Sequence, residues 1–136
     1  MTSALSALQR SIFTVLSQDN DLANVLGSAK IFDRVPERVE PPYVVLGRSM
    51  VSDWSTSTDT GEAIVFFIHV WSQANSRTEC NSIQAHIKRI LAANIPPLDS
   101  QTLVALRFQL AENRRDRLTE HIHGVMRFRA VIEQAN

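Results

Sequence analysis

A chain of 136 residues in which 44% are hydrophobic and 21% are charged can bury one globular core, and it is too short for a second independent one. Its 14 basic and 14 acidic residues give a formal net charge of zero, which excludes the general attraction to nucleic acid of a strongly basic domain. The single cysteine, Cys80, excludes an internal disulfide and a multi-cysteine metal site. We therefore expect residues 1–136 to form one domain in a reducing, intracellular setting.

The N-terminal segment predicts two consecutive helices. Its apolar side chains repeat at helical spacing: Leu5, Leu8, Ile12, Val15 and Leu16. An amphipathic helix should therefore cover residues 3–17. Asp19 and its neighbours can cap a short second helix over residues 22–26, which Gly27 ends. The segment has no signal-peptide pattern, and no apolar run approaches the roughly 20 residues of a membrane-spanning helix, so we expect a soluble protein that is not exported.

Strands should follow these helices. Residues 31–32 predict a short strand, and residues 43–46, which follow a pair of prolines, predict another. Residues 62–72 give the strongest strand signal and should be the most buried because of their apolar stretch. The polar loop between these strands, residues 52–61, is longer than a simple hairpin needs. We expect this loop either to be mobile or to be ordered by a partner.

A long helix is predicted after these strands. Ser76 and Glu79 have the spacing of a capping box, in which each side chain bonds a backbone N–H at the start of the helix. Four apolar residues then recur on one helical face: Ile83, Ile87, Ile90 and Leu91. Pro96 and Pro97 should end the helix.

The last two strands have the most informative pattern, because each shows two unlike faces. In the strand over residues 120–131, the core face should hold Ile122, Met126, Phe128 and Ala130, and the other face His121, His123, Arg127 and Arg129. In the strand over residues 103–113, the core face should hold Val104, Leu106, Phe108 and Leu110, and the other face Arg107, Gln109 and Asn113. If the two strands pair in register, Arg107, Arg127 and Arg129 form a cationic strip, and arginine is typical of protein interfaces.

The predicted order of elements is helix, helix, three strands, helix and two strands (α-α-β-β-β-α-β-β). This order predicts an α+β fold in which a mixed or antiparallel sheet of about four to five strands packs against two main helices. No repeat, low-complexity tract or linker interrupts it.

Catalytic and metal sites are weakly indicated. His121 and His123 can face the same side of a strand and hold a metal, but a closed site needs further ligands, and nothing in the sequence places His69, His86 or Cys80 beside them. A hydrogen-bonded role suits His69 better than a role as a base. Cys80, near the start of a helix, suits packing better than nucleophilic catalysis. We expect no metal, no cofactor and no enzymatic activity.

Two kinds of side chain in the polar loop remain open to interpretation. Asp53 and Asp59 can act as an acid–base pair or bind a hard cation, and Asx turns explain them equally well. Trp54 either folds back on its own domain or anchors a partner.

Six short motifs recur in order and at similar spacing in a family of phage proteins: 31–36 (IFDRVP), 42–47 (PYVVLG), 53–56 (DWST), 69–72 (HVWS), 106–108 (LRF) and 123–130 (HGVMRFRA). From its first helix to Val131, the chain resembles the small tail-completion or tail-terminator proteins of long-tailed phages and gene transfer agents. Residues 114–121 are longer and more charged than the tight turn expected for that family.

The resemblance implies a single tail-terminator-like domain that assembles as a hexameric ring on the head-proximal end of the tail tube. The ring would stop polymerisation of the major tail tube protein and bind the head-completion protein of the neck. The genome would pass through its lumen without sequence-specific binding, and no membrane would take part. The protein would lie at the tail–neck junction of a virion or phage-like particle, and in the host cytoplasm during assembly.

An assembly protein needs contact surfaces, and the candidates are the cationic face and the polar loop: Arg107, Arg127, Arg129, His121, His123, Asp53 and Trp54. The alternative function is a small ligand-binding or hydrolytic α+β enzyme using His121 and His123. Such an enzyme should have a concave pocket that joins these histidines to Asp53 or Asp59. A nucleic-acid module would need more positive charge and exposed stacking aromatics.

Overall fold

The computed structural model of the protein describes residues 3–73, 76–93, 98 and 101–134. A five-stranded sheet has the order β1-β2-β3-β5-β4, in which β1 is parallel to β2 and the other neighbours are antiparallel. The strands are β1 (Ile31–Phe32), β2 (Tyr43–Asp53), β3 (Gly61–Ser72), β4 (Gln101–Arg115) and β5 (Ile122–Gln134). The helices are α1 (Ala4–Gln18), α2 (Asn20–Leu26) and α3 (Arg77–Ala92). This confirms the predicted α+β class and order of elements.

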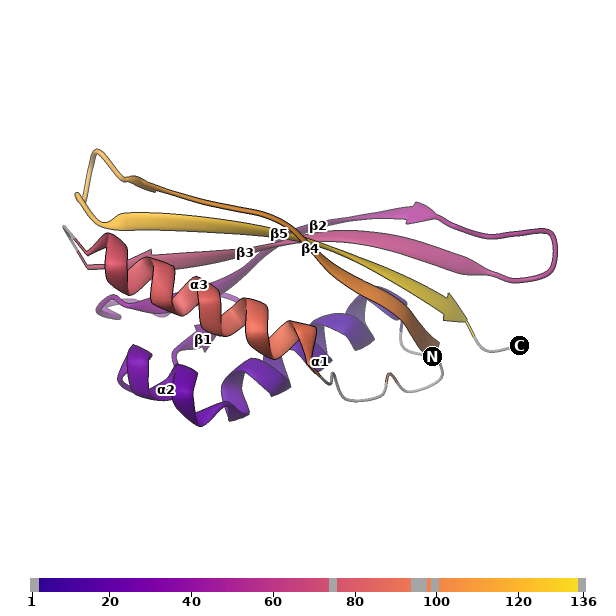
Figure 1. Ribbon diagram of the computed structural model, residues 1–136, viewed down its shortest axis with the longest axis horizontal. Helices are drawn as coiled ribbons and strands as arrows, with labels where there is room; N and C mark the ends of the chain where they lie inside the picture. Colours follow the sequence, from indigo (N-terminus) through magenta and orange to yellow (C-terminus); the bar gives the residue numbers. More distant parts are fainter. Residues whose placement is uncertain (1–2, 74–75, 94–97, 99–100, 135–136) are drawn as a thin grey trace.

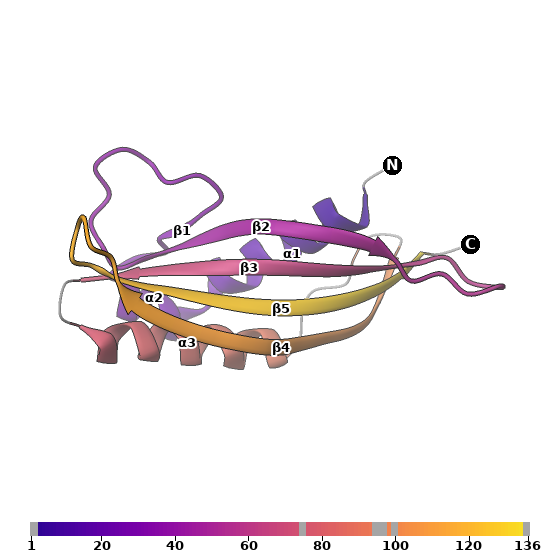
Figure 2. The same ribbon diagram turned by 90° about the horizontal axis from the view of Figure 1, so that it is seen from above.

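The helices all lie on one side of the sheet (Figure 1), and they run beneath its strands when the molecule is viewed from above (Figure 2). The core fills the space between the two layers. None of the described helices combines the length and apolar character needed to cross a membrane. The other face of the sheet is not covered by any described element, and this asymmetry positions the candidate site.

The first helix begins one residue after its predicted start, and the second begins at Asn20, two residues before its predicted range. Ser3 caps α1 by accepting a hydrogen bond from the backbone N–H of Ser6 (3.1 Å), and Asp19 caps α2 by accepting one from Leu22 (2.9 Å). Gly27 follows α2 with φ of 89°, a left-handed conformation in which glycine ends a helix without steric cost.

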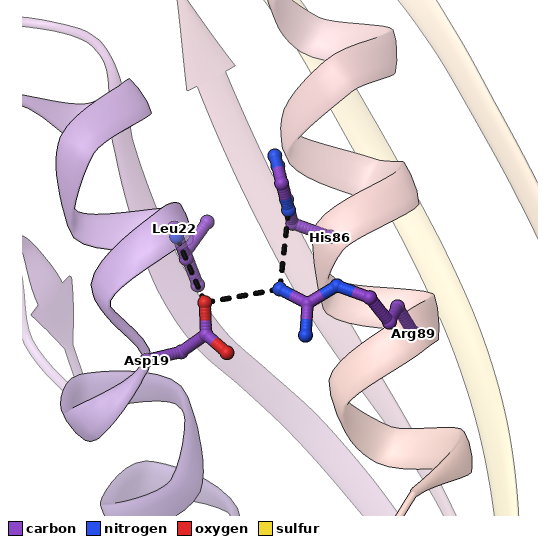
Figure 3. A network of polar contacts seen from close by, with 4 residues as sticks. All are labelled: Asp19, Leu22, His86 and Arg89. Carbon is purple, nitrogen blue, oxygen red and sulfur yellow. Dashed lines mark hydrogen bonds and ion pairs between the residues drawn. The ribbon is translucent and has the colours of Figure 1, made fainter.

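A polar network ties the junction of α1 and α2 to α3 (Figure 3). Arg89 donates to the carboxylate of Asp19 (3.0 Å), and its Nη2 also lies 3.2 Å from Nδ1 of His86. The hydrogen bond from Arg89 is the main reason that the pKa of Asp19 is lowered. Arg89 is half-exposed, so solvent screens this ion pair and keeps its contribution to stability small.

The capping box predicted at the start of α3 does not form. Ser76 is the N-cap residue, but its side chain makes no capping hydrogen bond. Glu79 instead accepts hydrogen bonds from the hydroxyl of Ser72 (2.5 Å) and the backbone N–H of Gln73 (3.1 Å). Glu79 therefore fixes the helix to the end of β3 rather than to its own first turn. The predicted stop at Pro96 and Pro97 lies outside the described residues.

Aromatic rings form the centre of the core. Phe128 is 1% exposed, stacks on Phe66 with ring centroids 5.4 Å apart, and meets the edge of Phe108 at 5.6 Å. Helix α3 crosses β5 closely at Gly124, where an added Cβ would lie 2.7 Å from Sγ of Cys80. Burial raises the pKa of Cys80 to about 11, so its thiol is a packing group and not an activated nucleophile.

The structure of β4 differs from the prediction of which side chains face the core. Its register with β5 shifts between Leu103 and Ala105 and again between Phe108 and Leu110. A bulge inserts an extra residue and reverses the alternation beyond it. Val104 and Leu110, both predicted in the core, are 47% and 37% exposed: Val104 lies within the first irregularity, and Leu110 is opposite Arg127.

Asn113 shows the same reversal. It was predicted on the face opposite the core, yet its side chain hydrogen-bonds Arg77 (2.6 Å) and Asn81 (2.8 Å) of α3. The β2 strand is also longer than predicted. It continues to Asp53, and β3 begins at Gly61, so the loop between them covers only residues 54–60.

Candidate assembly interface

The uncovered sheet face carries the cationic strip. Arg129 pairs with Val65 of β3 on one side and with Arg107 of β4 on the other, while Arg127 pairs with Phe67 and Leu110. The register therefore confirms that Arg107, Arg127 and Arg129 share one face. The β2 strand adds another arginine, because the guanidinium of Arg48 lies 4.9 Å from the ring centre of Phe67.

A stacked group of aromatic side chains continues this face toward the turn between β4 and β5. Nδ1 of His69 lies 2.9 Å from Nε2 of His123, and the ring of His123 stacks on Trp71 with centroids 4.0 Å apart and an interplanar angle of 5°. The sequence analysis did not place His69 beside His123, and the structure brings the two rings together. The hydrogen-bonded role predicted for His69 is confirmed.

The other predicted histidine is not part of this group. His121 precedes β5 in a turn, next to Glu120, which has φ of 62°. The same-face arrangement of His121 and His123 that strand alternation allows is therefore not made by β5, which begins only at Ile122. Among the residues that the structure describes, there is no group of at least three His, Cys, Asp or Glu side chains placed to hold a metal ion.

Burial favours the neutral form of both hydrogen-bonded histidines. Desolvation lowers the pKa of His69, and it is also the main cause that lowers the pKa of His123, assisted by the positive field of His69 and Arg114. Asp116 and Glu112 act on His123 in the opposite direction with smaller effect. Because one ring must accept the hydrogen bond, at least one of the two must be neutral.

We expect this histidine pair to make the fold less stable at mildly acidic pH. The unfolded histidines take up protons near their ordinary pKa of 6.5, whereas the folded ones do so only at lower pH. The free energy of unfolding should therefore fall as the pH drops from 7.5 to 5, and urea denaturation measures this. Asp19 and Asp116 also have lowered pKa values, but they contribute nearer their ordinary value of 3.8.

The matched variant for this prediction carries His69→Gln and His123→Gln. It keeps amide hydrogen-bonding groups in place of the rings but cannot titrate in this range. Its stability should change less between pH 7.5 and 5 than that of the wild type. An equal change in both proteins would show that the pair is not the source.

The candidate residues of the polar loop lie at the other end of the sheet. Asp53 accepts hydrogen bonds from the hydroxyl (2.7 Å) and backbone N–H (3.3 Å) of Ser55, which forms an Asx turn. The backbone N–H of Trp54 donates to Gly61 (2.9 Å). The Trp54 ring folds back over Gly61, 3.1 Å from an ideal Cβ there, and the residue remains 40% exposed.

The distance between the two ends argues against the enzyme alternative. Asp53 pairs with Glu62 and His123 pairs with Trp71, so nine residues of β3 separate them, or about 30 Å. Figure 1 shows the β2–β3 loop and the β4–β5 turn at opposite ends of the sheet. A pocket that joins these histidines to Asp53 or Asp59 is therefore absent from the described part of the chain.

The turn between β4 and β5 does form a shallow hollow of about 270 Å³, lined by residues 114–118 and His123. Its carboxylate, Asp116, accepts hydrogen bonds from the backbone N–H (3.0 Å) and hydroxyl (2.9 Å) of Thr119. These bonds lower the pKa of Asp116, so the group is an ionised turn cap and a poor proton donor near neutral pH. Leu118 projects from this turn and is 95% exposed.

The sequence interpretation missed several members of the uncovered face: Arg48, Phe67, His69, Trp71 and Leu110. The alternation within β3 could have indicated three of them, because Phe67, His69 and Trp71 occupy every second position of a strand whose intervening residues are buried. Arg48 lies within an irregularity in β2, and Leu110 comes directly after one in β4, so alternation alone does not indicate either.

Comparisons with known proteins give consistent results. The family model described as "Tail completion protein gp17" matches residues 10–133. A chain of the solved structure "Virion of native gene transfer agent (GTA) particle" is 29% identical, with a TM-score of 0.87, over 98% of this chain and 99% of that chain. The bacteriophage SPP1 gp17 protein is 24% identical, with a TM-score of 0.64, over 96% of this chain and 89% of that chain, and it supports the fold alone. No curated protein matches the chain.

Proposed function

Because this chain belongs to the tail completion protein gp17 family, a structural family of virion tail assembly, we propose that it caps the head-proximal end of a tail tube. In this role it stops tube polymerisation and joins the tail to the neck. The protein acts as a ring of identical subunits, a hexamer by resemblance to tail terminators, at the tail–neck junction of a phage or gene transfer agent particle. Its partners are the major tail tube protein and a head-completion protein.

The uncovered sheet face is the observation that carries this proposal. The face combines arginines with half-buried aromatic rings, which is the composition of protein interfaces and not of a freely hydrated surface. The side-chain Nε of Arg127 is buried, and no hydrogen-bond acceptor lies against it among the described residues. The rest of the Arg127 side chain is partly exposed on this face, where a partner can bind its charge.

The test of this function is deletion of the gene in the phage or gene transfer agent that encodes it. We expect headless tails, or tails of irregular and excessive length, because nothing ends tube growth or binds the neck. Electron microscopy of particles measures tail length and the fraction of tails joined to heads. Complementation with the wild-type gene should restore both. Normal tails on filled heads in the deletion strain would refute the proposal.

The same function predicts that the protein works without a metal. Elemental analysis of the purified protein should find no stoichiometric zinc or other transition metal. The double substitution His121→Ala and His123→Ala should leave the fold intact, as measured by circular dichroism, because neither histidine is in the core between the sheet and the helices. One metal ion per chain, lost in the double variant, would make the two histidines ligands.

A further inference from the structure

The sheet has two free edges of unequal length. At one edge, β4 pairs with β5 on its inner side, and no described strand lies on its outer side. At the other edge, β1 pairs only with Val44 and Val45 of β2. The second half of β2, from Ser49 to Asp53, is therefore uncovered by any strand in the described part of the chain. A free edge presents unpaired backbone groups that can bind a further strand.

Apolar side chains are exposed on both free edges. On β2, Met50 is 48% exposed and Val51 is 43% exposed. On β4, Val104 is 47% exposed and Leu110 is 37% exposed. Natural edge strands that avoid pairing carry charges or proline at such positions. These four apolar positions therefore favour burial against another chain.

The backbone of β2 is oriented for such pairing. The N–H of Trp54 donates to the carbonyl of Gly61 (2.9 Å), so Trp54 points its backbone groups toward β3. Backbone groups alternate in direction along a strand, and the register from Ser49 to Asp53 is continuous. The N–H and C=O groups of Val51 and Asp53 therefore point outward, into the free edge.

The two edges also match in direction and level. Successive antiparallel pairings make β2 and β4 run in opposite directions, so β2 of a second copy, continuing the sheet beside β4, would be antiparallel to it. Val51 is level with Leu106, through Ile64 of β3 and Ala130 of β5. The exposed Val104 is two positions from Leu106. Across the sheet, Ser49–Asp53 of β2 therefore lies at the same position along the strand direction as the part of β4 near Val104.

We propose that a second copy of this chain occupies each free edge, with Ser49–Asp53 of one protomer added as an antiparallel strand to β4 of the next. Pairing of like edges would make a closed dimer and leave the other edge of each copy exposed. Pairing of β2 with β4 buries both edges in every copy and can close into a ring. This inference rests on the proposed function, because it names the contact that joins the subunits of that ring.

The experiment places one lysine on each edge. Val51→Lys disables the β2 edge and Val104→Lys disables the β4 edge, because a lysine on an edge strand opposes pairing. Val35→Lys is the matched control, since Val35 is 39% exposed and lies in the connection between β1 and β2, outside both Ser49–Asp53 and β4. Circular dichroism and the melting temperature verify that each variant folds. Mass photometry of the free proteins and electron microscopy of purified tail tubes measure ring formation.

Wild type and Val35→Lys should form rings, free or on tube ends, and each edge variant alone should form none. An equimolar mixture of the two edge variants retains one intact β2 edge and one intact β4 edge. It should therefore give heterodimers of twice the subunit mass, and no ring. Ring formation by either edge variant at wild-type level would overturn the edge inference while leaving the proposed function standing. A wild-type protein that forms no ring and does not bind tubes would overturn both.

Discussion

Replacing Phe128 with alanine should lower the free energy of unfolding by about 3–5 kcal/mol, the cost of removing a large buried aromatic side chain. Phe128 is 1% exposed and lies between the rings of Phe66 and Phe108 on neighbouring strands. The cavity left by the ring would border three strands, which cannot collapse into it without breaking their pairing. Urea denaturation of the two proteins, followed by circular dichroism, measures the difference.

The matched control is Phe13→Ala on α1. Phe13 is the same residue type but is 42% exposed, so its loss should change the stability by no more than about 0.5 kcal/mol. Similar losses for the two variants would show that the stacked rings are not the centre of the core.

The faces of β5 could be predicted from sequence because local pattern and tertiary environment agree in that strand. It lies between β3 and β4, and its pairing with β3 is continuous from Ile122 to Glu133. Every side chain therefore stays on the face that simple alternation gives it. The positions of Arg127 and Arg129 followed directly from this rule.

The faces of β4 could not all be predicted from sequence, because its alternation is interrupted. Alternation assigns faces correctly only between bulges, and β4 has two irregularities, so the phase shared by Leu106 and Phe108 fails at Val104 and again beyond Phe108. No residue of β4 marks them, since the strand contains neither glycine nor proline. Leu110 and Asn113, which follow the second irregularity, were consequently assigned to the wrong faces.

The aromatic group on the uncovered face shows a different limit. His69 and His123 are 54 positions apart, and their contact depends on the register between β3 and β5. Sequence patterns within one strand contain no information on that register. Glu79 shows the same limit at a helix end, because a tertiary partner, Ser72, takes the carboxylate that the local capping pattern assigned to the helix.

Arg127→Glu should block tail completion without unfolding the protomer. Arg127 lies between Phe67 and Leu110 on the uncovered face, with the Nε group buried and lacking an acceptor among the described residues. If a partner carboxylate binds there, charge reversal places two like charges in a desolvated contact and costs about 3–5 kcal/mol. A deletion strain complemented with the variant should produce overlong or headless tails, as imaged by electron microscopy.

Arg34→Glu is the control for this experiment, because it makes the same change of net charge at an exposed position between β1 and β2. It should complement the deletion fully. Since β5 is an inner strand, Arg127→Glu should also leave the free edges intact, so rings of the variant should still form and fail only in completing the tail. Normal-length tails on filled heads, with wild-type infectivity, would mean that no partner carboxylate meets Arg127. The uncovered face would then line the lumen, where a reversed charge is tolerated.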